Sequence, residues 1–383
     1  TIFETVEFDH DVVRTRLREQ AFLNAGVKLR LIDEREETPE EEDFCYEGGI
    51  ASFVSYLNAQ KHCALVHPDV IWVKGSKGDM TAEIAIQYND SYNETVVTFA
   101  NNMSTVEGGT HETGFRLALT NALNTYARKW KFLKDKDKNL SGEDVREGIC
   151  AVISVKLPDA QFESQTKAKL GNSEVRTFVN NLLSAKLEEY LEENPSVGKA
   201  ILDKALAASR AREAARKARE QIEDGDTILL DSGTTALDLA ALLNELHNLT
   251  VITNDLQIAL KLQKCPEIHL ILLGGRVRTS FECTVGGMGI RALEELSVDK
   301  VFMTTNALSL QKGATTPNLD NAEIKRAMMK IGNQRYLLCD SSKIGTKTVC
   351  SFAKIEEFDV LITDNKISQE MKEKIEKLHI EVL

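Results

Sequence analysis

The spacing of apolar residues changes at about Gln221, and this change most constrains the fold. From that point short apolar segments alternate with helical segments as far as the C-terminus. The predicted strands are 227–230, 250–252, 269–273, 300–303, 334–338 and 360–363, and the predicted helices are 236–244, 256–263 and 321–331. Short apolar strands separated by helices are typical of βαβ units, in which helices cover both faces of a parallel sheet. We therefore expect residues 221–383 to form a doubly wound α/β domain.

The chain before this point follows a different pattern. Its apolar spacing predicts helices and strands in mixed order, with two helices in succession after residue 171. The expected helices are 11–24, 114–130, 172–193 and 196–220, and the expected strands are 27–32, 81–88, 94–101 and 148–156. We therefore expect a mixed α+β domain over 1–170 and a helical arm over 171–220, followed by the α/β domain. A length of 383 residues fits two or three domains.

The composition is that of a globular protein, with 42% hydrophobic and 28% charged residues. No apolar run approaches the roughly 18 residues that a membrane helix needs, and no secretory signal pattern follows Thr1. We therefore expect a cytoplasmic protein without a membrane partner. The net charge of −12 argues against tight non-specific binding of nucleic acid by the whole chain, although a local basic face can still bind it. The acidic stretch 34–43 is expected to be a solvated loop.

The spacing of cysteines and histidines indicates neither a disulfide framework nor a metal site. The seven cysteines are dispersed without a CxxC pair, which predicts reduced thiols. The seven histidines form no HxxxH or HExxH pair, so we expect no metal ligands.

In the first half, the most informative segment is the run Gln165, Thr166 and Lys167. It lies in an expected loop between the strand 148–156 and the helix 172–193. A lysine beside a glutamine on a loop can reach the terminal phosphate of a nucleotide and supply charge and hydrogen-bond donors. Taken alone, this signal is weak, because a loop lysine is usually just solvated.

Six segments occur in a fixed order along the first 220 residues: YEGGI at 46–50, QYND at 87–90, EGGTH at 107–111, GEDVREG at 142–148, QTK at 165–167 and AREAAR at 211–216. Together they resemble the transducer domain of bacterial DNA gyrase B and of its topoisomerase IV relative. The resemblance implies that Gln165 and Lys167 reach into a neighbouring ATP-binding domain and contact the γ-phosphate of ATP. It also implies basic helices that face a cavity for DNA, so DNA is a possible partner, with a solvated basic helix as the alternative. The arginines concerned are Arg210, Arg212, Arg216 and Arg219.

The other domains of that family are not found in this sequence. It contains neither the Asp-x-Gly-x-Gly loop and catalytic glutamate of the ATP-binding domain nor the metal-binding, DNA-cleaving region. ATP and Mg²⁺ are therefore expected only together with those domains, and no cofactor is expected for this chain alone. We assign no catalytic residue and expect this half to be inert by itself.

In the second half, the polar segment Asp231, Ser232, Gly233, Thr234 and Thr235 lies where a strand leads into a helix. Small residues there allow backbone N–H groups to converge on an anion at the helix N-terminus, and hydroxyls add donors. A plain capping turn explains the same residues equally well. The segment is not a Walker loop, because no Gly-Lys-Ser/Thr follows at the required spacing.

Six further segments follow in order: IEDGD at 222–226, TN at 253–254, GG at 274–275, GATTP at 313–317, AEIKRAM at 322–328 and DSSKIG at 340–345. This set resembles the C-terminal sensor domain of DeoR-family bacterial repressors, of the lactose and fructose type. The resemblance implies the fold of ribose-5-phosphate isomerase and a phosphorylated sugar or polyol as the effector. The family's winged helix-turn-helix is not found, and the transducer-like sequence stands in its place.

The same resemblance implies a set of pocket residues. The effector phosphate is expected at residues 231–235. The wall of the pocket is expected to be Thr253, Asn254, Gly274, Gly275, Lys325 and Lys343, with Glu323 and Asp340 as candidates for the sugar hydroxyls. This sequence has Thr304 to Ala307 where the family often has a glycine, which leaves the shape of the pocket open there.

These observations predict a chimera or fusion of two unrelated modules that are joined near Glu220 and Gln221. The first hypothesis is that the C-terminal module binds a phosphorylated sugar as the effector of a repressor, while the N-terminal module is a gyrase transducer that couples ATP binding to DNA strand passage. The second is a fragment of an ATP-dependent topoisomerase with the sensor as a scaffold. The third is a sugar-phosphate isomerase, which the fold alone suggests. We also expect a homo-oligomer.

Overall fold

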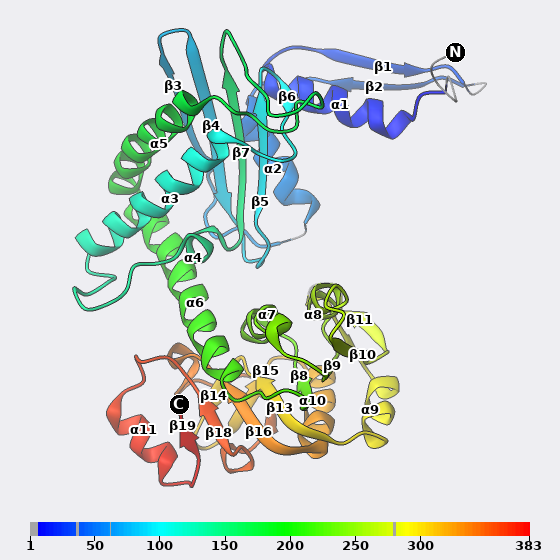
Figure 1. Ribbon diagram of the computed structural model, residues 1–383, viewed down its shortest axis with the longest axis vertical. Coiled ribbons are helices and arrows are strands. Elements are labelled where there is room, and N and C mark those ends of the chain that lie inside the picture. The colour runs from blue at the N-terminus through cyan, green and yellow to red at the C-terminus, as the bar shows by residue number, and fades with distance from the viewer. Residues whose placement is uncertain (1–6, 36–37, 62, 279–280) are drawn as a thin grey trace. The chain divides into compact units, whose positions relative to one another are not determined.

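The computed structural model describes residues 7–35, 38–61, 63–278 and 281–383 (Figure 1). The chain consists of two compact units, Thr1–Leu206 and Ala207–Leu383. The boundary between them falls inside α6 (Pro195–Arg219). The division into 1–170, 171–220 and 221–383 stays a prediction.

Unit 1 is built on a five-stranded sheet in the order β3-β4-β7-β5-β6. Its strands are β3 (Ile71–Lys77), β4 (Met80–Tyr88), β5 (Thr95–Ala100), β6 (Met103–Ser104) and β7 (Ile149–Lys156). The β5–β7 pair is parallel, and the other pairs are antiparallel. Because side chains alternate along a strand, the sheet supplies two cores, one on each face.

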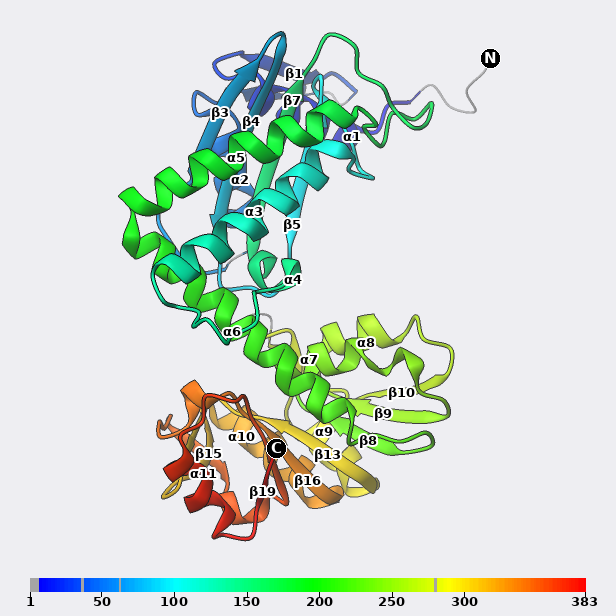
Figure 2. The ribbon, with the colours of Figure 1, turned by 60° about the vertical axis from the view of Figure 1, so that its left-hand side comes forward.

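Two long helices, α3 (Thr110–Lys129) and α5 (Ser173–Glu193), lie side by side over one face of this sheet (Figure 2). Their buried residues recur at helical spacing, which explains why the sequence predicts both helices. Gly114 allows the two helices to approach closely, since a Cβ there would lie 2.4 Å from the carbonyl oxygen of Arg176. A short helix, α4 (Gly142–Arg146), precedes β7 and is closed by a capping box between Ser141 and Asp144.

The other face of the sheet is covered by α1 (His10–Leu23) and α2 (Gly49–Gln60). A two-stranded ribbon joins these helices, formed by β1 (Leu29–Asp33) and β2 (Glu40–Phe44). The expectation of a solvated loop over 34–43 is therefore wrong for its last four residues, and residues 36 and 37 of that stretch lie outside the described residues. The carboxylate of Asp43 lies 2.6 Å from Nε of Arg30 and 2.8 Å from Nζ of Lys28, so cross-strand ion pairs hold an acidic strand in place.

Unit 2 contains a seven-stranded sheet in the order β10-β9-β8-β13-β16-β18-β19, and every pairing in it is parallel. The strands are β8 (Thr227–Leu230), β9 (Leu249–Thr253), β10 (Ile268–Leu272), β13 (Val298–Thr304), β16 (Gly332–Leu338), β18 (Val360–Ile362) and β19 (Glu381–Val382). The predicted doubly wound α/β architecture is confirmed.

Helices cover both faces of this sheet, as a parallel sheet requires. One core contains buried residues of α6, α7 (Thr234–Ala241) and α8 (Leu256–Leu262). The other contains buried residues of α9 (Gly287–Glu294), α10 (Leu319–Ile331) and α11 (Gln369–Glu376).

Smaller elements complete unit 2. Two antiparallel groups lie outside the main sheet, and three short 3₁₀ turns connect the larger elements. The first group is β11 (Arg276–Arg278) with β12 (Cys283–Val285). The second is β14 (Ala307–Ser309) with β15 (Gly313–Thr316) and β17 (Cys350–Ala353). The 3₁₀ turns are η1 (Leu243–Glu245), η2 (Ser341–Lys343) and η3 (Ile355–Glu357). All seven cysteines lie in the described parts of the chain, and none forms a disulfide. Within those parts, the helices lack the length and apolar character needed to cross a membrane.

Candidate functional site

The carboxyl ends of β8 and β13 meet at the point where the strand order of unit 2 reverses. The chain adds β9 and β10 on one side of β8 and then returns to add β13 on the other side. In doubly wound sheets, ligands bind in the crevice at such a point. Asp231 directly follows β8 and Thr304 is the last residue of β13, so these two residues mark the crevice.

The carboxylate of Asp231 is fully buried, and only one of its oxygens is hydrogen-bonded. Oδ2 accepts from the backbone N–H of Thr304 at 2.9 Å, from its Oγ1 at 2.9 Å, and from Nζ of Lys325. Oδ1 is buried and accepts no hydrogen bond from any residue that the structure describes. A buried polar atom without a partner is costly, so Oδ1 marks a place for a donor from a ligand or a water.

Lys325 extends from α10 into the same place and is only 3% exposed. Besides Asp231, its ammonium donates to the carbonyl oxygen of Thr304 at 3.1 Å and lies 5.3 Å from the centre of the Phe352 ring. A buried ion pair is tolerated only when its remaining hydrogen bonds are made. The contacts with Thr304 meet that need, so Lys325 is held rigidly beside Asp231.

Glu323 lies on the opposite side of α10 from Lys325. Two positions apart on a helix, residues are separated by about 200° around the axis. Accordingly, Glu323 is exposed while Lys325 is buried. The structure does not bring these two predicted pocket residues together.

The loop that leads into α7 is shaped by Gly233. Its φ of +142° favours glycine, and a Cβ there would lie 3.2 Å from Oγ1 of Thr304. The same Oγ1, whose single proton serves either Asp231 or Ser232, lies 2.6 Å from the carbonyl oxygen of Ser232, and this contact holds the loop against β13. Thr234 and Thr235 then form the first turn of α7, where free N–H groups favour an anion.

Asp255 places a second carboxylate close to this loop. It is the N-cap of α8 and accepts from the N–H groups of Gln257 and Ile258 at 2.8 and 3.0 Å. Burial raises the pKa of Asp255 to about 6; hydrogen bonds from backbone N–H groups, including that of Gly233, oppose this rise, and the charge of Asp231 adds to it.

Thr253 and Asn254 lie at the end of β9 and are buried. Oγ1 of Thr253 accepts from the N–H of Asp255 at 3.1 Å, and Nδ2 of Asn254 donates to the carbonyl oxygen of Thr284 at 2.9 Å. Oδ1 of Asn254 is buried and has no donor among the described residues. The two predicted glycines follow β10: a Cβ on Gly275 would lie 2.6 Å from the carbonyl oxygen of Val285, whereas Gly274 has open space around it.

Asp340 and Lys343 lie beyond the end of β16 and form an ion pair of 3.0 Å with each other. Burial would raise the pKa of Asp340, but Lys343, Ser342 and the more distant Arg210 outweigh it and hold that pKa below its usual value. Nε of Arg210 lies 4.0 Å from the Asp340 carboxylate. These contacts link Asp340 to α6 and not to Asp231.

The four arginines that the sequence offers for DNA binding differ in their surroundings. Three have partners inside unit 2: Arg210 has Asp340, Arg212 lies 3.9 Å from the Asp238 carboxylate, and Nε of Arg219 donates to the carbonyl oxygen of Leu242 at 3.1 Å. Arg216 is exposed. A DNA contact stays a prediction.

Gln165 and Lys167 lie at the exposed tip of a loop in unit 1. The base of this loop is anchored by Leu170, whose N–H donates to the carbonyl oxygen of Gly108 at 3.1 Å and whose carbonyl oxygen accepts from Thr110 at 3.0 Å. Lys167 has a φ of +56°, a left-handed conformation, and its N–H donates to the carbonyl oxygen of Ser164 at 3.1 Å. The tip is therefore a hydrogen-bonded turn on an anchored base, and the side chains of Gln165 and Lys167 are exposed at this tip.

Sequence reasoning did not assign three residues near the crevice to the pocket. Asp255 and Asn321 were not singled out, and Thr304 was named only as part of the segment where the shape of the pocket was left open. Asn321 precedes Lys325 by four residues and so lies on the same face of α10, and its Oδ1 is buried with no donor among the described residues. Thr304 and Asp255 could have been found by position, because polar residues at the carboxyl ends of buried parallel strands converge at one edge of the sheet. The signal for Asn321 was its four-residue spacing from Lys325.

Comparison with known proteins agrees with this two-part organisation. The DNA gyrase B family model matches residues 49–221, and that of the DeoR C terminal sensor domain matches residues 207–365. The DNA gyrase B protein of Clostridium acetobutylicum is 57% identical over 220 residues, which cover 57% of this chain and 34% of that protein. The corresponding protein of Enterococcus faecalis is 50% identical over 217 residues, again 57% of this chain and 34% of that protein. The chain thus spans about a third of the length of these curated relatives.

Among solved structures, the 43K ATPase domain of Thermus thermophilus gyrase B in complex with an aminocoumarin aligns with 58% of this chain and 58% of its own, at 42% identity and a TM-score of 0.51. Ribose-5-phosphate isomerase A from Methanocaldococcus jannaschii aligns with 35% of this chain and 53% of its own, at 18% identity and a TM-score of 0.27, a likeness too small to bear on function. Both predicted resemblances are confirmed: the chain joins a part similar to DNA gyrase B to a part similar to the DeoR C-terminal sensor domain.

Proposed function

We propose that unit 2 binds a phosphorylated sugar, as the effector-sensing part of a DeoR-type transcriptional repressor. The match of residues 207–365 to the DeoR sensor domain gives the class of protein. The observation that carries the proposal is Oδ1 of Asp231, an acceptor that is fully buried and lacks a donor among the described residues at the switch point of the sheet. A sugar hydroxyl is a suitable donor for it, because it brings an O–H into a place that excludes most water.

The phosphate is assigned to the start of α7. The N–H groups of the first helical turn and the hydroxyls of Ser232, Thr234 and Thr235 can all donate to phosphate oxygens there. The carboxylate of Asp255 repels a second anion, so binding should favour its protonated form and weaken as the pH rises above about 6.

A calorimetric melt with hexose phosphates, pentose phosphates, inorganic phosphate and ATP tests this assignment. One transition should rise with a sugar phosphate, by an amount equivalent to about 2.7 kcal/mol when the ligand is at a hundred times its Kd. Thr234→Asp should abolish that rise without lowering the transition itself, because an acidic residue in the first turn stabilises a helix but repels phosphate. Gln369→Asp, at the first position of α11, is the matched control and should leave the rise unchanged. If a sugar phosphate still raises the transition in the Thr234→Asp variant, the assignment of the phosphate to the start of α7 is wrong.

For unit 1 we propose the role of a gyrase transducer, in which Gln165 and Lys167 contact the γ-phosphate of ATP bound by a neighbouring ATP-binding domain. The exposed tip on an anchored base supports this role, as does the match of residues 49–221 to gyrase B. We also propose that this unit forms homo-oligomers, as a gyrase B-like part suggests.

A gyrase ATP-binding domain supplied in trans provides the test of the transducer role. Lys167→Ala should lower the ATPase rate of the mixture by about a hundredfold, the effect of removing one donor from a developing charge. Lys169→Ala is the matched control, because Lys169 is already paired with Glu163 at 2.8 Å and should have no effect. Equal rates for both variants would rule out the proposed phosphate contact.

A further inference from the structure

Arg278, on the short hairpin of β11 and β12 in unit 2, has a buried hydrogen-bond donor without an acceptor. Its Nη1 is buried and donates to no residue that the structure describes. The guanidinium also forms no ion pair with a described residue, whereas Arg276, two positions earlier on β11, is paired with Asp320. A buried donor without an acceptor is costly, so Nη1 of Arg278 indicates an acceptor that a ligand or a water supplies.

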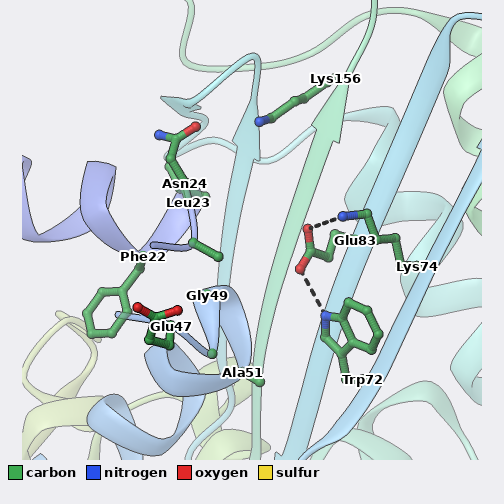
Figure 3. A pocket seen from close by; sticks show the side chains of 12 residues that line it. Phe22, Leu23, Asn24, Glu47, Gly49, Ala51, Trp72, Lys74, Glu83 and Lys156 are labelled. Carbon is green, nitrogen blue, oxygen red and sulfur yellow. Dashed lines mark hydrogen bonds and ion pairs between the residues drawn. The ribbon is translucent and has the colours of Figure 1, made fainter. Parts of the chain in front are cut away.

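The cavity of about 500 Å³ in unit 1 contains no comparable group. Among the described residues that line it, no side chain has a buried polar atom without a partner. Figure 3 shows Glu83 there in contact with two neighbours, Nε1 of Trp72 at 2.9 Å and Nζ of Lys74 at 3.7 Å. The buried groups without partners in unit 2 are therefore the stronger indication of a ligand.

Strand pairing places the side chain of Arg278 beside the loop that leads into α7. Arg278 lies directly opposite Cys283 in the β11–β12 pair, and Cys283 in turn forms a β-bridge with Asp255. Side chains directly opposite each other in an antiparallel pair lie on the same face. The thiol of Cys283 is hydrogen-bonded to the side chain of Ser232. The guanidinium therefore lies on the face of the hairpin that is turned toward Ser232, just before the first turn of α7.

The pKa of Cys283 depends on the same neighbours. Burial raises this pKa, the hydrogen bond with Ser232 opposes the rise, and the charges of Asp231 and Asp255 add to it. The positive charge of Arg278 acts in the opposite direction and lowers the pKa of Cys283. Because the interaction between charges falls with distance, all three charged side chains lie near this thiol.

A phosphate at the start of α7 needs more positive charge than the pocket residues supply. The charge of Lys325 is compensated by Asp231. Asp255 has no basic partner among the described residues, and its hydrogen bonds come from backbone N–H groups. A helix N-terminus contributes only about half a positive charge, whereas a phosphate monoester carries up to about two negative charges. The unpaired guanidinium of Arg278 can supply the difference.

Phe281 holds this guanidinium in place. Cζ of Arg278 lies 4.3 Å from the centre of the Phe281 ring, which is a cation–π contact. Stacking covers a face of the planar guanidinium and leaves the N–H donors at its edge available. Two parallel N–H donors match two oxygens of a phosphate.

We propose that Arg278 is the phosphate clamp of unit 2: its guanidinium donates two hydrogen bonds to the phosphate of a ligand bound at the start of α7. This inference rests on the proposed function of unit 2 and adds the residue that determines its preference for a phosphorylated ligand. The hairpin of β11 and β12 then distinguishes a sugar phosphate from the uncharged sugar, and the helix terminus does not do so alone.

Isothermal titration calorimetry of the whole chain with fructose 6-phosphate, ribose 5-phosphate and inorganic phosphate tests the clamp. Arg278→Gln should weaken binding of the sugar phosphate by about thirtyfold, the usual effect of losing hydrogen bonds to a charged group. It should weaken binding of inorganic phosphate by the same factor, because Arg278 contacts only the phosphate. Arg278→Lys keeps the charge but loses the paired donors, and should weaken both by about fivefold.

Arg276→Gln is the matched control, because Arg276 lies on the same strand and is already paired with Asp320. Its affinities should stay within about twofold of those of the natural sequence. A calorimetric melt without ligand shows whether each variant is folded, and Arg278→Lys provides the second comparison if Arg278→Gln is not.

The outcomes separate the clamp from the proposed function. If the natural sequence binds a sugar phosphate and Arg278→Gln binds it equally well, the clamp is wrong and the sugar-phosphate assignment stands. The clamp is also wrong if Arg278→Gln loses affinity for the sugar phosphate but not for inorganic phosphate, because Arg278 would then contact the sugar. If inorganic phosphate binds through Arg278 but no sugar phosphate binds, the clamp is supported and the sugar-phosphate function is wrong. Binding of none of the three ligands by the natural sequence would overturn both.

Discussion

At the scale of single residues, His111 makes the stability of unit 1 depend on pH. Its side chain is fully buried in α3, and its contact is between Nε2 and Oγ1 of Thr105 at 3.1 Å. Burial lowers the pKa of His111 to about 4, below its usual 6.5. As the pH falls below about 6.5, His111 becomes protonated in the unfolded chain but stays neutral in the folded chain. The free energy of unfolding of unit 1 therefore decreases between about pH 6.5 and about pH 4.

We expect unit 1 to lose about 2 kcal/mol from this group between about pH 7 and about pH 5. His111→Gln should remove that part of the pH dependence, because glutamine does not titrate in this range. Urea unfolding at a series of pH values measures it. If the free energy of unfolding of the His111→Gln variant changes with pH as steeply as that of the natural sequence, other groups cause the pH dependence.

Asp255 gives unit 2 the opposite dependence. Its folded pKa of about 6 lies above the unfolded value of 3.8, so the folded chain holds a proton that the unfolded chain releases. The contribution of Asp255 to the free energy of unfolding of unit 2 is therefore fully present below about pH 4 and is lost as the pH rises through about 6.

We expect Asp255→Asn to stabilise unit 2 at pH 7 by up to about 3 kcal/mol, since asparagine caps α8 equally well and carries no buried charge. Asp255→Ala separates the two effects, because it also removes the charge but loses the cap, at a cost of about 1 kcal/mol. If asparagine is no better than aspartate at pH 7, the carboxylate is compensated in the folded protein.

At the scale of elements, the sequence predicted regular helices and strands better than it predicted the contacts between them. Buried residues at helical spacing identified α3 and α5, and apolar runs identified six of the seven parallel strands of unit 2, all except the two-residue β19. The strand β2 was missed, because its acidic residues become a strand only through ion pairs with β1. The strands β14, β15 and β17 were missed because they are short and pair only with one another.

The same limit applies to the site. The resemblance to the DeoR sensor domain placed Asp231 and Lys325 in one pocket, and the structure brings these two residues into contact. The same resemblance placed Glu323 in that pocket, although helical geometry turns that residue outward. Which oxygens lack donors depends on side-chain rotamers that the sequence does not reveal.

Gly109 provides a test at this scale. It is the N-cap of α3 and packs against Leu170, at the base of the loop that contains Gln165 and Lys167. A Cβ there would lie 2.5 Å from the carbonyl oxygen of Leu170, a contact that no side-chain motion relieves. We expect Gly109→Ala to cost about 3 kcal/mol and to expose the Leu170 amide to hydrogen exchange. Gly78→Ala is the control: its φ of +58° is also left-handed, but nothing lies within 4 Å, so it should cost only about 1 kcal/mol. Equal costs would show that the contact with Leu170 has no energetic importance.

At the scale of the whole molecule, the two family matches overlap over residues 207–221, within and just beyond α6. In unit 2 this segment buries Ala211, Ala214, Ala215 and Ala218, followed by Ile222. Small residues at helical spacing let α6 approach the sheet closely. The last part of α6 therefore falls within both matches, and its small residues serve the core of unit 2.

Because each unit has its own cores, we expect two calorimetric transitions that respond to pH in opposite directions. Between about pH 7 and about pH 5, His111 alone should lower the transition of unit 1 by about 4–8 °C, and Asp255 alone should raise that of unit 2 by about 3–5 °C. In the His111→Gln and Asp255→Asn variants, each transition should lose its own shift and leave the other unchanged. A sugar phosphate should raise only the transition that Asp255→Asn alters. A single transition, or two that move together in every variant, would mean that α6 couples the units into one cooperative structure.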